Sequence, residues 1–222
     1  MGATPEQPTY ALEKSNEKPA HEVSLSSYCI GQTEVTQALW QAVTGNNPYD
    51  NPSYFTGDLN RPVECVSWEN CQEFIKRLNQ ITGKTFRLPT EAEWEFAARG
   101  GNKKQGFVYA GSNSIGSVAW YKNNAYDVGS HSPDYGTHTV ASKAPNELGL
   151  YDMSGNVAEY VQDYSGEYGL LAETNPKGPS TGYFHIVRGG SWDDQDSECR
   201  VSRRVSKNPK ECGWRTGLRL AL

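Results

Sequence analysis

The chain has 222 residues, of which 36% are apolar and 21% charged, and its formal net charge is −5. This length suits one large domain with a substantial core. No cluster of lysine and arginine is long enough to follow a phosphate backbone, so nucleic-acid binding is not expected. No apolar stretch approaches the ~20 residues that cross a bilayer, and no signal peptide is recognisable at the start.

The opening of the chain, to about residue 20, is polar and is expected to form an arm. Apolar and polar residues alternate over 21–30, which predicts a strand. A first helix is expected over about 33–43, because Val35, Leu39 and Val43 would share one face.

Two further helices carry clear end signals. Apolar residues recur at helical spacing over about 67–82, Ser67 is suited to cap the start, and Gly83 follows the end. The third helix is expected to start with a capping box formed by Thr90 and Glu93 and to end near residue 100.

The rest of the chain is rich in turns. An exposed loop is expected over 126–137, and short strands are expected over 157–164, 186–189, 199–205 and 218–222. Helices that precede strands, without βαβ alternation, indicate an α+β domain.

Five cysteines are present, so at least one is unpaired within the chain. None belongs to a C-x-x-C pair, which argues against a zinc site. We expect mostly buried free thiols. If the protein is exported, a disulfide stays open as an alternative, with Cys199 and Cys212 the nearest pair in the tail.

Seven motifs follow one another in the order found in the formylglycine-generating-enzyme (sulfatase-modifying factor) family, which the chain therefore resembles. They occupy 33–36, 62–68, 87–95, 149–152, 155–157, 188–192 and 217–219. The resemblance implies a single C-type-lectin-like α+β domain over residues 1–222, with few regular elements, long loops and residues 1–20 as the polar arm.

The resemblance implies a calcium site in the segment that begins at Asp152. Asp152 and Glu159 would supply side-chain oxygens, and Gly155 and Val157 would supply backbone carbonyls. Such a mixture suits calcium, which takes six to eight hard oxygen ligands. The alternative is a turn in which Asp152 bonds backbone amides and Glu159 faces solvent.

The resemblance also implies a thiol centre, in which two cysteines and a serine act with copper on a substrate cysteine. Ser191 matches the serine and Cys199 the second cysteine, but Asp194 stands where the first cysteine belongs. A carboxylate beside one thiolate is a poor pair for Cu(I), so copper is not expected. The aromatic residue that the family has after 156–157 is replaced by Ala158. These changes leave enzymatic activity uncertain and favour a role without catalysis.

The segment between the thiol motif and the last motif corresponds to the ligand-facing surface of the C-type-lectin-like fold. Variable proteins of diversity-generating retroelements share this fold and diversify the same segment. Tryptophan and arginine, which are common in binding hot spots, occur in it. The expected contact residues are Trp192, Asp193, Asp194, Gln195, Asp196, Glu198, Arg200, Arg203, Lys210, Trp214 and Arg215. The alternative is an ordinary solvated face with weak salt bridges.

The favoured interpretation is therefore a calcium-stabilised module that displays residues 193–215 to a protein or glycan ligand. The alternatives are a metal-dependent oxidoreductase of the family that acts on cysteine in sulfatases, and a structural component of an envelope or phage assembly. In the family an opening strand usually precedes a pair such as Met1–Gly2. A trimmed leader would indicate an extracytoplasmic or cell-surface protein, and otherwise the cytoplasm or a phage particle is expected. The sequence leaves the oligomeric state and the ligand open.

Overall fold

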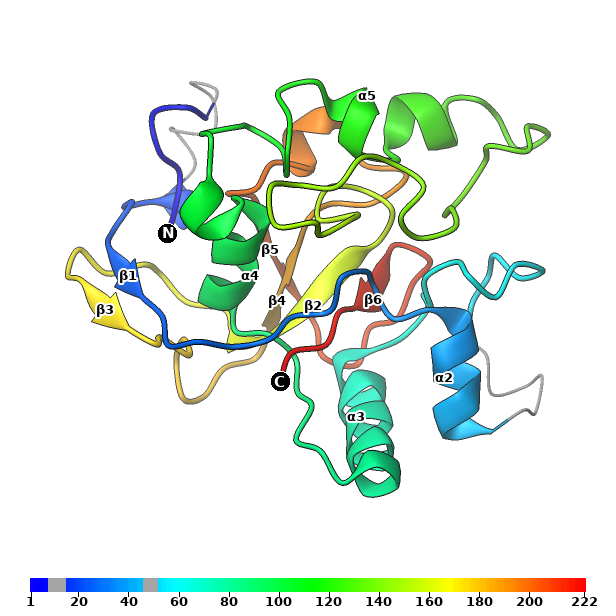
Figure 1. Ribbon diagram of the computed structural model, residues 1–222, viewed down its shortest axis with the longest axis horizontal. Coiled ribbons are helices and arrows are strands. Elements are labelled where there is room, and N and C mark those ends of the chain that lie inside the picture. The colour runs from blue at the N-terminus through cyan, green and yellow to red at the C-terminus, as the bar shows by residue number, and fades with distance from the viewer. Residues whose placement is uncertain (8–14, 46–51) are drawn as a thin grey trace.

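The computed structural model describes residues 1–7, 15–45 and 52–222, and Figure 1 shows how their elements are arranged. A four-stranded sheet lies at the centre, with strand order β5-β4-β2-β6. Its strands are β2 (Ala158–Tyr164), β4 (His185–Arg188), β5 (Arg204–Lys207) and β6 (Thr216–Leu218). The β2–β6 pair is parallel, and the β2–β4 and β4–β5 pairs are antiparallel. A separate parallel pair joins β1 (Val23–Ser24) to β3 (Glu173–Thr174).

The helices precede the strands of the central sheet in the chain, and this separation of helices from strands is typical of an α+β domain. They are α2 (Gln37–Thr44), α3 (Trp68–Thr82), α4 (Glu91–Ala98) and the short α5 (Ile115–Val118). Single turns occur at η1 (Ser15–Glu17), η3 (Gly101–Lys103), η4 (Lys122–Tyr126) and η5 (Asp196–Glu198). None of the helices in the described ranges is long and apolar enough to span a bilayer.

The capping residues expected from the sequence set the ends of two helices. Ser67 accepts a hydrogen bond from Asn70 N at the start of α3, and Gly83 ends that helix in the left-handed conformation with φ +67°. At α4 the capping box is complete, because Thr90 accepts from Glu93 N and the Glu93 side chain accepts from Thr90 N.

Several predicted boundaries were wrong. The first helix begins at Gln37, because Thr36 acts as its cap. The strand expected over 21–30 has only two residues in β1. The strand expected over 199–205 begins at Arg204, because turns fill the positions before it, including the bond from Arg203 N to Arg200 O. β6 ends at Leu218, and the last residues make isolated bridges instead. The loop over 126–137 was predicted correctly beyond the end of η4.

The two faces of the central sheet are covered differently, as the alternation of side chains along strands allows. On one face α4 packs against β2 and β4 (Figure 1). There Trp94 belongs to a buried cluster with Val161 and Ile186. On the other face, Tyr160 and Val187 pack in a cluster with Phe74 of α3. The helix α3 covers only part of that face.

The expectation of mostly buried thiols holds for only part of the set. Cys71 and Cys199 are buried, Cys65 is half-buried, and Cys29 and Cys212 are exposed, all five as free cysteines. The deep burial of Cys199 and the exposure of Cys212 give no support to a disulfide between them.

Candidate functional site

A cavity of about 310 Å³ lies over the part of the sheet that α3 leaves uncovered. Its floor consists of small residues of the sheet and of the turn after β4, among them Ala158, Gly189, Gly190 and Thr216. Its rim is charged and comes mostly from the tail segment, with Asp194, Glu198, Arg203, Lys207, Glu211 and Arg215. The cavity therefore combines a floor that includes small residues with a rim of positively and negatively charged side chains.

Ala158 is the reason that the floor is low. It pairs with Thr216 of β6, it is 8% exposed, and it lines the cavity. The family resemblance implies an aromatic residue at this position. An aromatic ring on the same face would fill a large share of 310 Å³, so the replacement by alanine opens the space.

A carboxylate pair at the rim is held by Ser191 and Arg215. The Ser191 Oγ lies 2.9 Å from Asp193 Oδ1 and 2.6 Å from Asp194 Oδ2. A hydroxyl has one proton, so it cannot donate to both carboxylates. Burial raises the pKa of Asp194, and the hydrogen bond from Ser191 opposes this shift in part. Arg215 Nε lies 2.6 Å from Asp193 Oδ2 and holds the second carboxylate.

Cys199 does not fit the copper centre that the resemblance implies. Its thiol is fully buried against Gly190, where an added Cβ would lie 2.8 Å from Sγ. Burial raises the pKa of Cys199 well above its usual value, and Asp194, Glu198 and Asp196 raise it further. The thiolate is the form that binds a soft metal, and here it is disfavoured and has no second thiol at position 194.

The predicted calcium loop is deeply buried and fits the ion only in part. Asp152 Oδ2 accepts from Ala141 N at 2.7 Å, while Oδ1 is buried with no hydrogen-bond partner in the part of the chain that the structure describes. Glu159, in contrast, receives Arg219 Nη2 at 2.7 Å and Trp94 Nε1 at 2.6 Å. Glu159 is thus an ion-pair partner of Arg219 in this arrangement. Both oxygens of Glu159 accept hydrogen bonds from Arg219 and Trp94, so they are not free for calcium in this arrangement. The side chain is fully buried, so it does not face solvent either.

Three buried carboxyl groups, those of Glu34, Asp152 and Glu159, lie together in this region. Glu34 is buried beside Asp152 and Glu159, and burial together with these two carboxylates raises the pKa of Glu34 well above its usual value. Burial raises the pKa of Asp152 to about 6. Among the described residues, Arg219 is the guanidinium that bonds Glu159 in this group, and a buried charge is costly unless it is balanced. No group of three His, Cys, Asp or Glu side chains is arranged to hold a metal within the described ranges.

The structure adds four aromatic residues to the predicted contact residue Trp214, and sequence reasoning missed these four. We call Tyr54, Phe55, Tyr126, Tyr135 and Trp214 the aromatic patch; they surround the buried ring of Trp192. The Tyr54 ring lies 5.6 Å from Trp214, and Phe55 and Tyr135 lie 5.0 and 5.1 Å from Trp192. Tyr54, Tyr126 and Trp214 are exposed. Because these rings come from separate loops, no local pattern in the sequence places them together.

Two predicted contact residues lie in the interior, so these predictions were wrong. Trp192 is 1% exposed and donates from Nε1 to Trp214 O at 3.0 Å. Arg200 is also 1% exposed and forms two 2.8 Å bonds with Glu17 of the arm. Asp193 is buried as well, with 2% of its side chain exposed, which makes it a third wrong prediction. The exposed or half-exposed residues that remain are Asp194, Gln195, Asp196, Glu198, Arg203, Lys210, Trp214 and Arg215.

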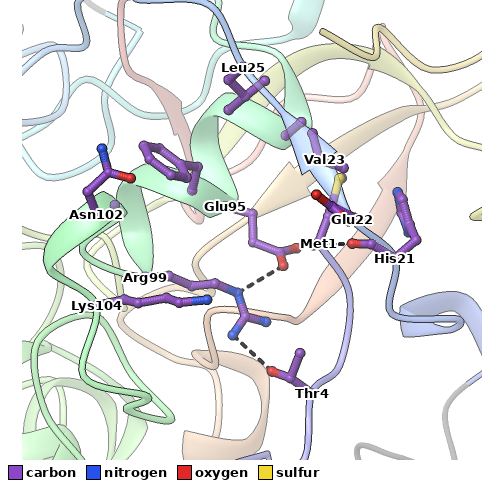
Figure 2. A pocket seen from close by; sticks show the side chains of 13 residues that line it. Met1, Thr4, His21, Glu22, Val23, Leu25, Glu95, Arg99, Asn102 and Lys104 are labelled. Atoms are coloured by element: carbon purple, nitrogen blue, oxygen red, sulfur yellow. Dashed lines mark hydrogen bonds and ion pairs between the residues drawn. The ribbon is translucent and has the colours of Figure 1, made fainter. Parts of the chain in front are cut away.

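A second cavity, of about 450 Å³, lies between the start of the chain and α4 (Figure 2). Two of its charged groups, Glu95 and Arg99, bond each other and the start of the chain. Arg99 Nε donates to Glu95 Oε1 at 2.9 Å, and Gly2 N donates to the same oxygen at 2.8 Å. Arg99 Nη1 also donates to Thr4 Oγ1. These bonds fasten residues 1–4 to α4, and their groups are not free for a ligand.

Comparison with known proteins defines the family and the fold of the chain. The sulfatase-modifying factor enzyme 1-like domain matches residues 1–222. The chain therefore belongs to the sulfatase-modifying factor (formylglycine-generating enzyme) family. It is 33% identical to the chaperone protein LppX of Paenibacillus barcinonensis, over 89% of this chain and 81% of that protein.

Two other relatives show how far the likeness extends. The formylglycine-generating enzyme of Streptomyces coelicolor is 33% identical over 82% of this chain, which spans 60% of that enzyme. The structure of Treponema denticola variable protein 1 superposes with a TM-score of 0.83 and 35% identity, over 94% of this chain and 88% of that one. The fold is thus the α+β domain that the motifs predicted, with a variable protein among its structural neighbours.

Proposed function

We propose that the chain is a ligand-binding and display module without catalytic activity, whose binding surface is the cavity over the sheet together with the aromatic patch. The observation that carries this proposal is the replacement of a thiol centre by an open, charged cavity. Ala158 lowers the floor, Asp194 bonds Ser191, and the remaining thiol is buried. One of the two cysteines expected for cysteine oxidation is replaced by Asp194 and the other, Cys199, is buried, while space for a ligand is present.

The composition of this surface supports a protein or glycan ligand. Exposed Tyr and Trp side chains offer large, rigid contact areas, and they are enriched in binding surfaces together with arginine. Arg215 lines the cavity and directly follows Trp214 of the patch in the chain. The likeness to Treponema denticola variable protein 1 supports a display role, in which outward residues of 193–215 differ between copies of the protein.

The test is a screen of the intact chain on a glycan array and on a displayed peptide library, followed by affinity measurement for the best ligand. Ala158→Trp would fill the cavity and should reduce affinity at least 10-fold. Leu170→Trp adds the same side chain on an exposed loop outside the cavity and should not change affinity. Equal binding by both variants would contradict the cavity as the site.

Two further measurements separate display from its alternatives. Sequencing the same locus in several isolates should show differences concentrated in the outward residues of 193–215; invariance there would refute diversification and leave ligand binding untouched. Copper-dependent oxidation of a cysteine peptide, if it were seen with the wild type and lost in Cys199→Ser, would overturn the proposal in favour of an oxidoreductase.

We also propose calcium as a stabilising ion, held by Asp152 with the carbonyls of Gly155 and Val157. The support is the unpartnered Asp152 Oδ1 and the excess of buried carboxylates around it. The ion would balance this negative charge and fix the loop that leads into β2. Glu159 is left out of the set, because Arg219 and Trp94 already occupy both of its oxygens.

A further inference from the structure

Two of the free cysteines, Cys65 and Cys212, are brought together next to the rim residue Glu211 of the cavity by segments that are far apart in the sequence. Cys65 N donates to Gly213 O at 3.2 Å, so the backbone next to Cys212 lies against Cys65. The rings of Tyr54 and Trp214 meet at 5.6 Å across the same two segments. The stretch before α3 and the stretch after β5 are therefore side by side at this point.

The two thiols differ in exposure and share one cationic neighbour. Cys212 is exposed and Cys65 is half-buried. Burial, and then the neighbouring Glu64 carboxylate, raise the pKa of Cys65 to about 12, and the Cys212 thiol adds to this shift. Burial lowers the pKa of the Lys207 ammonium group. Cys212 and Cys65 each raise that pKa slightly, because both thiols lie near Lys207. Lys207 Nζ donates to Thr216 Oγ1 at 2.7 Å, beneath the same rim.

We propose that Cys65 and Cys212 form an oxidisable pair, which a small disulfide such as glutathione disulfide converts into an intramolecular disulfide. Disulfide exchange needs a thiolate, an accessible partner and sulfurs that can approach each other. The pair joins an accessible thiol to one held beside it by the backbone, and this combination is absent from the buried Cys71 and Cys199.

The exchange has two steps, and its atoms and electrons balance. The Cys212 thiolate attacks one sulfur of glutathione disulfide, the reagent's S–S bond breaks, and one glutathione leaves as thiolate. The Cys65 thiolate then attacks Cys212 Sγ, the mixed disulfide breaks, and the second glutathione leaves. The protein loses two protons and two electrons in total, and one glutathione disulfide becomes two glutathione thiols. The second step is the slow one, because little of Cys65 is thiolate at neutral pH.

The cross-link would restrain the loop that forms one side of the cavity. Residues 208–215 include the rim residues Glu211 and Arg215 as well as Trp214 of the aromatic patch. Bound to Cys65, this loop loses freedom relative to the stretch that bears Tyr54. Oxidation would thus set the shape of the binding surface, a consequence that rests on the proposed function, whereas formation of the disulfide does not.

The experiment uses the intact native chain without any ligand. Glutathione disulfide is added, and mass spectrometry of the protein and of its non-reduced peptides follows the products. We expect a mass decrease of two hydrogens, a peptide that joins Cys65 to Cys212, and slower amide exchange over 208–215. Cys212→Ser should abolish the cross-link, and Cys29→Ser, which removes the other exposed thiol, should not.

A second variant tests the role assigned to the acidic neighbour. Glu64→Gln removes the negative charge beside Cys65 and should speed closure of the disulfide severalfold without changing the first step. A wild-type product that stops as glutathionylated Cys212, or a cross-link that involves Cys29, Cys71 or Cys199, would overturn the pairing. Either result would leave the ligand-binding proposal standing, since that is measured on the reduced protein.

Discussion

The two faces of the central sheet use charged side chains for opposite purposes. On the face under α4, Arg188 donates to Glu95 Oε2 at 2.6 Å and Arg204 Nη2 donates to Glu91 Oε2 at 2.6 Å, all of them buried. On the cavity face, Glu198 and Arg203 also meet at 2.6 Å, but both are partly exposed to solvent. Charges that are matched and buried hold the scaffold together, while charges at the rim are free to be exchanged for a ligand.

The largest expected effect is on the buried face. Glu95→Gln removes the shorter of the two ion pairs of Arg188, which keeps Glu91 at 3.5 Å, and it also removes the ion pair of Glu95 with Arg99. The change should lower the free energy of unfolding by about 3 to 5 kcal/mol, because buried charges lose their closest counter-charge. Urea unfolding measures this loss. The matched change at the rim, Glu198→Gln, should cost about 1 kcal/mol or less. Equal losses at both positions would remove the distinction between the two faces.

The second effect concerns pH and Asp163 on the buried side. Burial, and then Glu91, raise the pKa of Asp163 to about 7. An acid with a raised pKa in the folded state binds its proton more tightly when folded. Its stabilising effect is therefore present at low pH and is lost as the pH rises from about 4 through about 7, by about 4 kcal/mol in full.

Thermal melts between pH 5 and 8, with chelator present, test this expectation. Asp163→Asn should flatten the loss of stability toward pH 8, since the amide cannot ionise. Asp127→Asn, on an exposed loop, should leave the slope of the wild type unchanged. An undiminished slope in Asp163→Asn would assign the pH dependence to another group.

Calcium comes third in size. Removal of the ion with chelator should lower the free energy of unfolding by roughly 1 to 3 kcal/mol, as expected for a site that is well saturated. Asp152→Asn should abolish this sensitivity, because it removes the negative charge of the carboxylate whose Oδ1 has no hydrogen-bond partner among the described residues. Magnesium serves as the control ion. Superimposable melting curves of the wild type with calcium and with chelator would exclude the site.

The smallest expected effect on stability comes from the aromatic patch. Trp214→Ala should change the free energy of unfolding by about 0.5 kcal/mol or less, since the ring is largely exposed, and should weaken ligand binding markedly. Trp192→Ala, in the interior behind it, should cost about 3 to 5 kcal/mol. Urea unfolding of both variants measures their stability, and their affinity for the ligand found by the screen is measured alongside. Together these measurements show whether each tryptophan contacts the ligand or supports the fold.

The sequence predicted the helices well, because their ends are marked by local chemistry. Ser67, Gly83 and the Thr90–Glu93 capping box act on the backbone within a turn or two. The strands of the tail were harder to place. There Arg200 is drawn inward by Glu17, more than 180 positions away, and the chain turns where alternation alone suggested a strand.

The sequence showed which residues of the candidate site differ from the family pattern, but it did not show which distant residues meet there after folding. Asp194 and Ala158 differ from the family pattern at single positions, so the sequence revealed both changes and the structure shows the cavity between them. The patch around Trp192 depends on loops that meet only after folding. The pairing of Glu159 with Arg219 is likewise a contact between distant residues. Because of it, the proposed calcium ligands no longer include Glu159.

The tail segment also separates positions that must be kept from positions that are free to vary. Arg200, Ser202 and Arg204 point inward and are buried, and the first two bond Glu17 while the third bonds Glu91. Arg203 and Val205 between and beyond them face outward. A library that randomises the outward positions and retains these three inward ones should therefore keep its members folded, which makes this chain a practical scaffold for selecting new binders.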